Sequence, residues 1–559
     1  MSCHLNLTIT QPLPAPPFWN LHRPLLAGEA LALLASMFFV LVCNRQFWAA
    51  AFAGRSAADA GSWFFAFGML VALVGIHTLL VAPFISRWTA KPLLSVLIVA
   101  TAFATYYMES FSVYLDPGMV RNVLATESKE SRDLLVWGMA SHLALNAGLP
   151  LVVLWVIRLK RLPLARALGF RAAFLIGTLT ITVAAVALVY RDLSSLMRNH
   201  KEVRYLITPA NFLYSTARAL SSVDTGAVKS RMEIGGDAHL AGSWQARKKP
   251  VLFLMVVGET VRAANWGLDG YARQTTPQLK QLGVINFSDV ASCGTDTETS
   301  VPCMFSAIGR RDYDEDRIRR SESLLHVLRR AGFDVIWRDN NTGCKGVCAG
   351  FREDRVDRLP AADLCEEGVC FDEALLKGID SLLKDRSGNL FIVLHQVGNH
   401  GPAYFNRYPS AFRRFTPTCD TSELRACTRE EIVNTYDNAI LYTDHFLARA
   451  VDFLASKEAE YTTAMLYVSD HGESLGEAGL YLHGIPYAIA PTVQKQVPMV
   501  MWFSSGFLRS FGLDERCLRR QASLPVSHDN VFHSVLGMLE IQTSVLDPTL
   551  DLSLSCRKR

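Results

Sequence analysis

The chain has 559 residues and a formal net charge of +4, and 50% of its residues are hydrophobic. This length exceeds that of one typical domain, so at least two domains are expected. A net charge this small over so long a chain gives no reason to expect a nucleic-acid partner. The hydrophobic residues are unevenly distributed, which predicts a membrane domain followed by a water-soluble one.

Five apolar stretches of membrane length lie in the first third of the chain, at residues 25–43, 63–84, 92–108, 134–157 and 172–190. A membrane-spanning helix needs roughly 20 predominantly apolar residues. Any one stretch could be a buried core helix, but five in succession with none later favour a membrane domain. The residues before the first stretch lack the pattern of a cleavable signal peptide, so the first span is expected to be an uncleaved anchor.

The basic residues predict how the chain crosses the membrane. The loop after the fourth stretch carries five basic residues and no acidic one: Arg158, Lys160, Arg161, Arg166 and Arg171. The loop after the second stretch carries Arg87 and Lys91, whereas the loop after the third contains both acidic and basic residues. Because loops rich in Lys and Arg stay in the cytoplasm, everything after residue 190 is expected outside.

Ten of the 12 cysteines lie beyond residue 290, in the part expected outside. Closely spaced cysteines in an exported domain predict disulfides. Proximity suggests the pairs Cys293–Cys303, Cys344–Cys348, Cys365–Cys370 and Cys419–Cys427, which leaves Cys517 and Cys556. The alternative is a structural zinc cluster, but the pairs do not repeat the two-residue spacing of such sites.

The remaining chain is expected to form a linker and an α/β domain. Residues 193–205 and 211–215 suit interfacial helices, and 221–247 reads as an extended connector. Beyond residue 250, strand-like runs at 251–257, 334–337, 390–396, 463–469 and 497–503 alternate with helical ones at 324–331, 373–384 and 432–456. This alternation predicts a largely parallel sheet. The predicted boundaries are 1–190 for the membrane domain, 191–249 for the linker and 250–559 for the soluble domain.

Metal-binding residue types follow three of these strand-like runs. Glu259 comes after the first, His400 shortly after another, and Asp470-His471 directly after a third. Ligands of open α/β sheets bind at the carboxyl ends of the strands, and carboxylate and imidazole groups are good zinc ligands. The alternative is a set of solvated residues in strand-to-loop turns. With the hydroxyl-rich segment 293–303, the pattern favours a metallohydrolase-type site.

Five long motifs resemble those of the lipid A phosphoethanolamine transferases, a family that includes the enzymes behind colistin resistance. They are Gly258-Glu259-Thr260, the segment 293–305 (CGTDTETSVPCMF), 337–341 (WRDNN), 395–404 (HQVGNHGPAY) and 469–477 (SDHGESLGE). The resemblance implies a five-helix transmembrane domain followed by an α/β domain of the alkaline-phosphatase and sulfatase type. It also implies a multi-pass protein of the bacterial inner membrane whose catalytic domain lies in the periplasm.

The resemblance also implies the site residues. The zinc ligands would be Glu259, Thr297, Asp470 and His471, with Thr297 as the nucleophile. The substrate-binding residues would be His400, His483, Lys345, Asn122, Thr126 and Glu130. The last three are spaced by four, which would put them on one face of a helix.

The implied reaction moves phosphoethanolamine from phosphatidylethanolamine to a phosphate of lipid A, through a zinc-bound phosphothreonine-type intermediate, and releases diacylglycerol. It would lower the negative surface charge and so confer resistance to polymyxin and other cationic peptides. The partners would be the two lipids and the bilayer, and the protein is expected to be a monomer.

Three alternative functions remain open at this point. The acceptor could be a lipopolysaccharide core sugar or another glycan. The group moved could be phosphoglycerol, as in the lipoteichoic acid synthases. The chain could also be a membrane-anchored binding protein with an inactive phosphatase-like domain.

Several single residues have competing interpretations. Thr295, Thr299 and Ser300 are rival hydroxyls to Thr297, and His483 could be an ordinary surface histidine. His395 is expected to be structural. In the fourth apolar stretch, His142 and Asn146 could be functional or could hydrogen-bond between helices. The acidic residues that flank the expected nucleophile, Asp296 and Glu298, have no explanation in the sequence.

Overall fold

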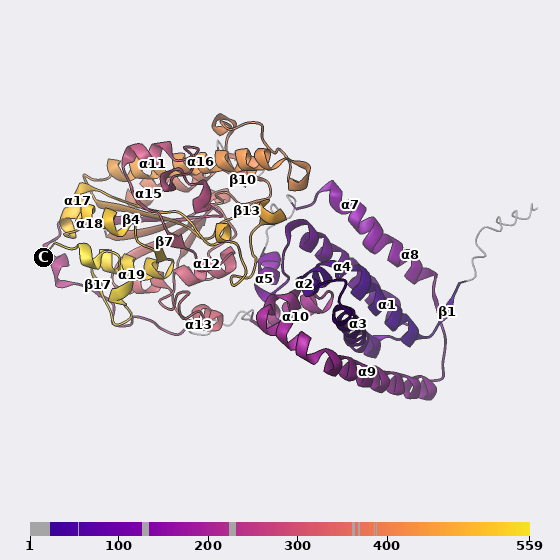
Figure 1. Cartoon of the computed structure of the whole chain (residues 1–559). Coiled ribbons are helices and arrows are strands. Elements are labelled where there is room, and N and C mark those ends of the chain that lie inside the picture. Colours follow the sequence, from indigo (N-terminus) through magenta and orange to yellow (C-terminus); the bar gives the residue numbers. More distant parts are fainter. Residues whose placement is uncertain are drawn as a thin grey trace, which may run out of the picture. The chain divides into compact units, whose positions relative to one another are not determined.

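The structure is a computed structural model that describes residues 23–53, 55–125, 134–222, 231–359, 364–366, 369–384, 386 and 388–558. The chain divides into two compact units (Figure 1). One unit comprises Met1–Phe103 and His142–Asn199, and the other comprises Ala104–Ser141 and His200–Arg559. The second unit therefore includes a segment between two apolar helices. The domain boundaries expected at residues 190 and 249 stay predictions.

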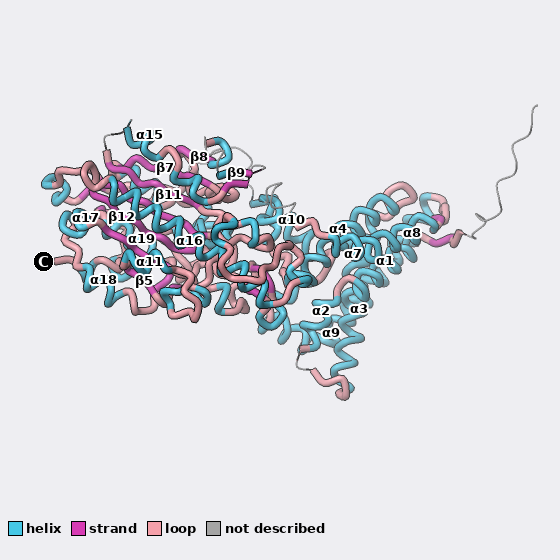
Figure 2. Tube along the Cα trace, turned by 90° about the horizontal axis from the view of Figure 1, so that it is seen from above, coloured by secondary structure: helices cyan, strands magenta, loops and turns pink. Residues whose placement is uncertain are grey.

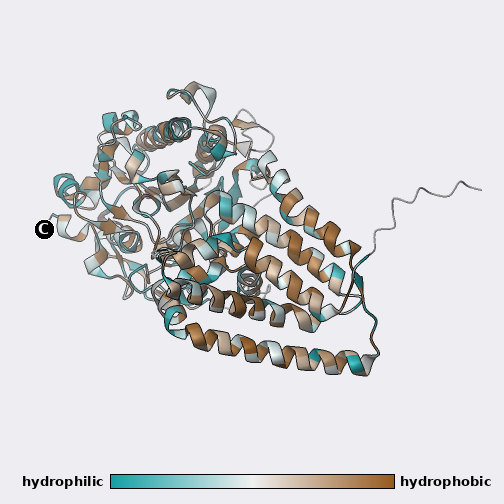
Figure 3. Cartoon of the chain, turned by 45° about the vertical axis from the view of Figure 1, so that its right-hand side comes forward, coloured by the Kyte–Doolittle hydropathy of each residue, from teal (hydrophilic) through white to brown (hydrophobic). Residues whose placement is uncertain are grey.

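The apolar stretches form helices whose ribbons are mostly hydrophobic in Figure 3. Four are long and apolar enough to cross a membrane: Ala60–Phe84, Ala90–Phe111, Trp137–Val156 and Ala165–Ser194. The first stretch forms α1 (Gly28–Val42), and the residues after it form α2 (Arg45–Phe52), with a bend of 58° between the two helices. A fifth span results only if this pair counts as one. The other apolar stretches contain α3 (Ala60–Val81), α4 (Ala90–Phe111), α7 (Trp137–Leu143), α8 (Leu149–Val156) and α9 (Leu164–Asn199).

Small residues let α3 and α9 approach closely. A Cβ at Gly68 would overlap Val189, and one at Gly75 would overlap Thr182. Helices in a membrane gain most of their association energy from such close packing, since lipid is as apolar as the side chains. The helix α9 also runs on to Asn199 because no proline interrupts it, and so it takes in much of the interfacial helix expected at residues 193–205.

The second unit contains a seven-stranded sheet (Figure 2). Its order is β5 (Ile285–Phe287), β15 (Met499–Phe503), β12 (Thr462–Ser469), β4 (Val251–Gly258), β11 (Asn389–His395), β7 (Phe333–Asp339) and β8 (Arg352–Arg355). The neighbours from β12 to β8 are parallel, whereas β15 is antiparallel to both β12 and β5. The largely parallel sheet expected from the sequence is confirmed.

The three central strands are buried on both faces, as their continuous apolar runs require. Alternate residues of β4 (Val251, Phe253, Met255 and Val257) share one core cluster with α14 (Leu324–Arg330) and α19 (Asp529–Met538). In Figure 1 the helices α11 (Pro277–Leu282) and α16 (Arg429–Ser456) cover the opposite side from α12 (Thr297–Met304) and α19. The α/β layers therefore surround the strands that end at the metal-binding residue types.

Two local expectations are wrong. The expected extended connector spans residues 221–247, of which 223–230 lie outside the described residues. Residues 231–247 are not such a connector: β3 (His239–Leu240) pairs with β17 (Ile541–Gln542), and Trp244 packs edge-on against Phe333 and Phe511. Because Gly and Ala dominate this segment, its composition does not indicate that a few side chains such as Trp244 anchor it. Residues 373–384 do not form one helix either, because a glycine at position 378 with φ of 74° separates a 3-10 turn from α15 (Ile379–Lys384).

The four disulfides expected from the cysteine spacing are present, and the two remaining cysteines of the second unit form a fifth. Bonds join Cys293–Cys303, Cys344–Cys348, Cys365–Cys370, Cys419–Cys427 and Cys517–Cys556. The fifth closes the longest loop, with a sequence separation of 39. Four bonds therefore brace local loops, and the fifth ties the C-terminal end to α18 (Glu515–Gln521).

A buried histidine connects three segments of the second unit. His528 Nδ1 accepts a hydrogen bond from the Cys293 backbone N–H at 3.0 Å, and its Nε2 donates to the Ser469 carbonyl at 3.0 Å. The ring is therefore neutral, because Nδ1 can accept a hydrogen bond only when it carries no proton. Burial lowers the pKa of His528 to about 4.

We predict that Gly258→Ala destabilises the second unit by about 1–3 kcal/mol, because overpacking forces a core side chain to move. A Cβ at Gly258 would lie 2.5 Å from the ring of Tyr467, which is buried and stacks on Trp266. Urea unfolding of the detergent-solubilised protein measures the change. The control is Gly242→Ala, where a Cβ meets nothing within 4 Å. Equal midpoints for the two variants would contradict the close contact.

We predict that His528 makes the second unit less stable as the pH falls from 6.5 to 4. The folded state holds the ring neutral, whereas the unfolded state takes up a proton below its ordinary pKa of about 6.5. The shift to about 4 corresponds to a loss of about 3 kcal/mol across that window, with no further loss below it.

Urea unfolding across this pH range tests the effect. His528→Gln should flatten the pH dependence relative to wild type, whereas the exposed His239→Gln should keep it. An unchanged slope in His528→Gln would show that the ring is not held neutral.

Candidate active site

The ends of two neighbouring parallel strands bring three metal-binding residue types together. Glu259 directly follows β4, and Asp470 and His471 directly follow β12. The Asp470 N–H donates to the Gly258 carbonyl at 2.9 Å, which continues the pairing of the two strands. All three side chains are fully buried. Parallel pairing therefore places two carboxylates and an imidazole side by side, as the sequence motif predicts.

Thr297 is the first residue of α12 and points into this group. Its Oγ1 donates to Glu259 Oε2 at 3.0 Å and lies 3.5 Å from His471 Nε2. The helix is held in place by Ser300, whose Oγ donates to the Asp470 carbonyl at 2.6 Å and accepts from the Gly294 N–H at 2.8 Å. The hydroxyl is therefore fixed next to the buried carboxylates.

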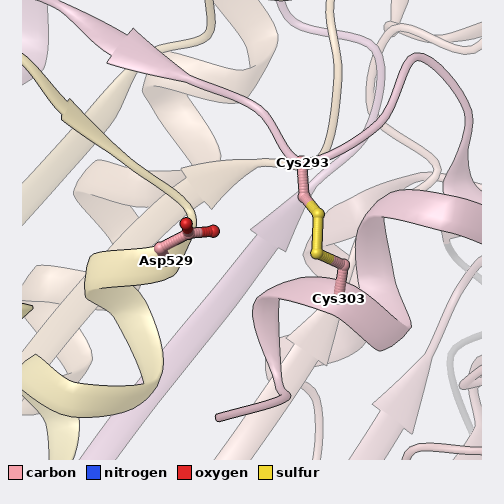
Figure 4. A group of neighbouring side chains, drawn as sticks. All are labelled: Cys293, Cys303 and Asp529. Atoms are coloured by element: carbon pink, nitrogen blue, oxygen red, sulfur yellow. A yellow bond between two sulfur atoms is a disulfide. The ribbon is translucent and has the colours of Figure 1, made fainter. Parts of the chain in front are cut away.

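The disulfide Cys293–Cys303 brackets α12 (Figure 4). Asp529 lies beside it, and its carboxylate accepts hydrogen bonds from the backbone N–H groups of Arg310 and Arg311 at 2.5 and 2.9 Å. Both sulfur atoms are bonded to each other, so this group of two cysteines and a carboxylate braces the helix and does not offer a metal site. The same conclusion holds for Cys344, Cys348 and Glu353.

The donor atoms face one another. His471 Nδ1 donates to the Gly472 carbonyl at 2.9 Å, which turns Nε2 toward Glu259 Oε1 at 3.3 Å and Asp470 Oδ2 at 3.5 Å. Asn341 donates to Glu259 Oε2 at 2.8 Å and so orients that carboxylate. Such outer contacts fix the tautomer and direction of metal-binding side chains.

The buried ionisable groups of the cluster shift one another's pKa values. Burial and the charge of Glu259 raise the pKa of Asp470 to about 7. Burial opposes protonation of His471, but the two carboxylates outweigh it and raise its pKa to about 10. The hydrogen bond and charge of His471 in turn hold the pKa of Glu259 well below its ordinary range despite burial. Two buried carboxylates require positive charge beside them.

This donor set fits a zinc ion. One ligand atom each from Glu259, Asp470 and His471 lies within 4.8 Å of the others. Asp470 Oδ2 is buried and has no hydrogen-bond partner among the described residues. With Thr297 Oγ1 the group offers four oxygen and nitrogen donors, which is the number and chemistry that a protein zinc site uses.

Two further histidines border the cluster. The His483 ring lies 4.3 Å from that of His471 and 5.6 Å from that of His400. His483 Nδ1 is 3.3 Å from Glu473 Oε2, and the backbone carbonyl of His400 accepts from Arg407 at 2.7 Å. The structure therefore brings both predicted substrate-binding histidines to one side of the donor cluster.

Lys345 approaches α12 from the loop after β7. Its Nζ lies 3.1 Å from Glu298 Oε1 and donates to Thr342 Oγ1 at 2.6 Å. Burial opposes ionisation of Glu298, but Lys345 and Arg319 outweigh it and lower the pKa of Glu298 below its ordinary value. Lys345 thus reaches the residue that follows Thr297.

The segment after α4 is only partly described. Asn122 lies in α5 (Pro117–Ala125), a helix of the second unit that packs against α12 and α10 (Ala210–Ser222). Thr126 and Glu130 lie outside the described residues. Of the predicted lipid-contacting residues, the structure therefore places Asn122 alone, in a helix next to the one that carries Thr297.

Two of the three rival hydroxyls, those of Thr295 and Ser300, have other hydrogen-bond partners. Thr295 Oγ1 donates to the Ile485 carbonyl at 2.7 Å, and Ser300 Oγ is used by Asp470 as described. His395 is buried inside β11, where its Nδ1 lies 2.9 Å from Asp339 Oδ2, as a structural histidine would be. In the helix α7 and its continuation, Asn146 donates to the His142 carbonyl at 3.1 Å.

Two residues of the site have no role predicted from the sequence. Asn341 orients Glu259, and Glu473 contacts His483. Both stand in the motifs that carry the family resemblance, and Asn341 follows the end of a predicted strand. That position, at the carboxyl end of a parallel strand, is the signal that could have identified it.

Known proteins resemble the chain along nearly its whole length. Residues 73–223 match the family model described as phosphoethanolamine transferase EptA/EptB, and residues 252–541 match the model described as sulfatase. Phosphoethanolamine transferase EptA of Escherichia coli is 39% identical over 84% of this chain and 86% of its own length. Phosphatidylethanolamine transferase Mcr-2 of Escherichia coli is 37% identical over 91% and 94%.

Solved structures agree with these relatives. The integral membrane protein lipooligosaccharide phosphoethanolamine transferase A of Neisseria meningitidis is 35% identical, with a TM-score of 0.88 over 96% of this chain and 100% of its own. The soluble domain of that protein is 43% identical and covers 59% of this chain and 99% of its own, with a TM-score of 0.57. The chain therefore belongs to the phosphoethanolamine transferase family of the alkaline-phosphatase-like superfamily.

Proposed function

We propose that the protein transfers phosphoethanolamine from phosphatidylethanolamine to a phosphate of lipid A. The observation that supports this is the convergence of Thr297 with the buried donors Glu259, Asp470 and His471 at the ends of β4 and β12. The names of two relatives supply the donor, phosphatidylethanolamine, and an acceptor class, lipooligosaccharide.

Glu259, Thr297, Asp470 and His471 would hold one zinc ion. When bound, zinc lowers the pKa of a coordinated hydroxyl and stabilises negative charge on phosphoryl oxygens. The chain's own contribution is preorganisation. Asn341 and the Gly472 carbonyl orient two of the four donors, so little reorganisation is needed when the reaction begins.

In the first step Thr297 Oγ forms a bond to the phosphorus of phosphatidylethanolamine, and the bond from phosphorus to the diacylglycerol oxygen breaks. The hydroxyl proton leaves on the side of Glu259 Oε2, which accepts its hydrogen bond in this structure. His483, which Glu473 orients, is suited to give a proton to the departing diacylglycerol oxygen. Phosphoethanolamine remains on Thr297.

In the second step an oxygen of a lipid A phosphate forms a bond to the same phosphorus. The bond to Thr297 Oγ breaks, the threonine takes back its proton from the side of Glu259, and His483 takes up the proton that the lipid A phosphate loses. Lys345 and His400, which border the cluster, would hold the phosphate and position the phosphoethanolamine group during both steps. The products are modified lipid A and the original enzyme.

Both substrates are membrane lipids, which gives the apolar half a role besides anchoring. We infer that α1 and α2 together make a fifth span, which puts the second unit on the periplasmic side of the bacterial inner membrane. Each transfer adds an ammonium group to lipid A. The lower negative surface charge would reduce binding of polymyxin and other cationic peptides.

We predict that Thr297→Ala abolishes the modification of lipid A while leaving a folded protein. Loss of a nucleophile typically lowers turnover by at least about a thousandfold. Mass spectrometry of lipid A from bacteria that express each variant measures the result. The control is Thr299→Ala, which removes a neighbouring hydroxyl of the same helix and should keep the phosphoethanolamine mass increment.

Any other result of this experiment would contradict one specific part of the proposal. A wild-type-like increment in Thr297→Ala would exclude this residue as the nucleophile. An increment on the core sugar in place of lipid A would change the acceptor. A phosphoglycerol increment would change the transferred group, and a folded, zinc-loaded wild type that modifies no lipid would leave the binding-protein alternative.

A further inference from the structure

Two acidic residues flank Thr297, and they differ in their contacts. Asp296 caps α12, because its Oδ1 accepts from the Thr299 N–H at 2.9 Å. Such a cap stabilises the start of a helix by about 1 kcal/mol. A helix cap accounts for Asp296. Glu298 needs another explanation, since it caps nothing and its side chain is 8% exposed.

The Glu298 carboxylate lies between two cations. Its Oε1 is 3.1 Å from Lys345 Nζ, and its Oε2 is 3.2 Å from Arg319 Nη2. Arg319 also donates to the Glu298 backbone carbonyl at 2.8 Å. Arg319 thus holds Oε2 of the carboxylate, and Oε1 faces Lys345.

The loop that carries Lys345 is built to hold one conformation. Lys345 has a φ of 51°, in the left-handed region that a residue with a side chain seldom adopts. The disulfide Cys344–Cys348 closes the loop around it. The Lys345 side chain is 6% exposed, and its Nζ also donates to Thr342 Oγ1 at 2.6 Å. A long, flexible ammonium side chain is thereby confined at a fixed place.

Two parallel bridges connect α12 to this loop. In the first, Glu259 accepts hydrogen bonds from both Thr297 and Asn341. In the second, Glu298 contacts Lys345, which donates to Thr342. On the α12 side the bridges use the neighbours Thr297 and Glu298, and on the loop side they use the neighbours Asn341 and Thr342. The second bridge therefore sets where the Lys345 ammonium stands relative to the nucleophile.

We propose that Glu298 is a positioning residue that holds the Lys345 ammonium beside Thr297 and partly neutralises it. The inference rests on the proposed function, in which Lys345 holds the phosphate of the phosphoethanolamine group. A positioned cation meets the phosphate in the orientation that the transfer needs, so Glu298 raises turnover. The carboxylate charge also repels the phosphate, so Glu298 weakens phosphate binding and favours product release.

Glu298→Gln tests both effects because it keeps the shape and removes the charge. We expect zinc-loaded, detergent-solubilised protein to bind phosphoethanolamine about tenfold more tightly by calorimetry, since a nearby like charge is gone. With phosphatidylethanolamine as donor, we expect both kcat and KM of diacylglycerol release to fall. A residue that only supported the fold would lower the melting temperature and the active fraction and leave KM unchanged.

Two further variants identify the route of the effect. Glu315→Gln removes another carboxylate that contacts Arg319, at 3.0 Å, but that has no contact with Lys345 among the described residues. It should change affinity and KM by less than about twofold. Combining Glu298→Gln with Lys345→Met should give the same constants as Lys345→Met alone, because Glu298 acts through Lys345.

The possible failures are distinguishable. Unchanged affinity and turnover in Glu298→Gln, or additive effects in the double variant, would overturn the role of Glu298. Wild type that binds phosphoethanolamine but releases no diacylglycerol would overturn the proposed function, and calorimetry alone would then decide on Glu298. Wild type that binds no phosphoethanolamine would overturn both.

Discussion

The structure of the second unit depends on one electrostatic constraint, which is the burial of two carboxylates beside each other. Glu259 and Asp470 stand at the ends of adjacent parallel strands, away from water. Their charge has to be matched by protons, by His471 or by a bound cation. The chain provides a histidine with a strongly raised pKa and leaves one oxygen of Asp470 without a hydrogen bond among the described residues. A site of this kind is prepared for a metal ion.

The surroundings of the cluster are correspondingly rigid. The helix that carries Thr297 is held by a disulfide, by Ser300 on the Asp470 carbonyl and by a cap at Asp296. The neutral ring of His528 joins the start of the same segment to the end of β12. Several independent contacts thus fix one hydroxyl against one carboxylate. Catalysis by preorganised groups requires this, because a misplacement of about 1 Å is costly.

The sequence predicts much of this arrangement because parallel strands carry a clear signal. Runs such as the one before Glu259 are continuously apolar, and polar residues after them must meet at one edge of the sheet. Contacts between distant segments leave no such signal. The anchoring of residues 231–247 by Trp244, the orientation of Glu259 by Asn341 and the pairing of Glu298 with Lys345 depend on side chains that approach only in the folded chain.

Contacts in the folded chain also decide which residues belong to the second unit. The described residues from Ala104 to Ser141 comprise the end of α4, α5 and the start of α7, and they belong to the second unit. Ser215 donates to the Leu115 carbonyl at 2.7 Å, Arg121 pairs with Glu315, and Arg425 donates to the Glu109 carbonyl. These contacts join α5 to the unit that carries Thr297, and α5 itself packs against α12, so the helix after α4 belongs to the surroundings of this hydroxyl.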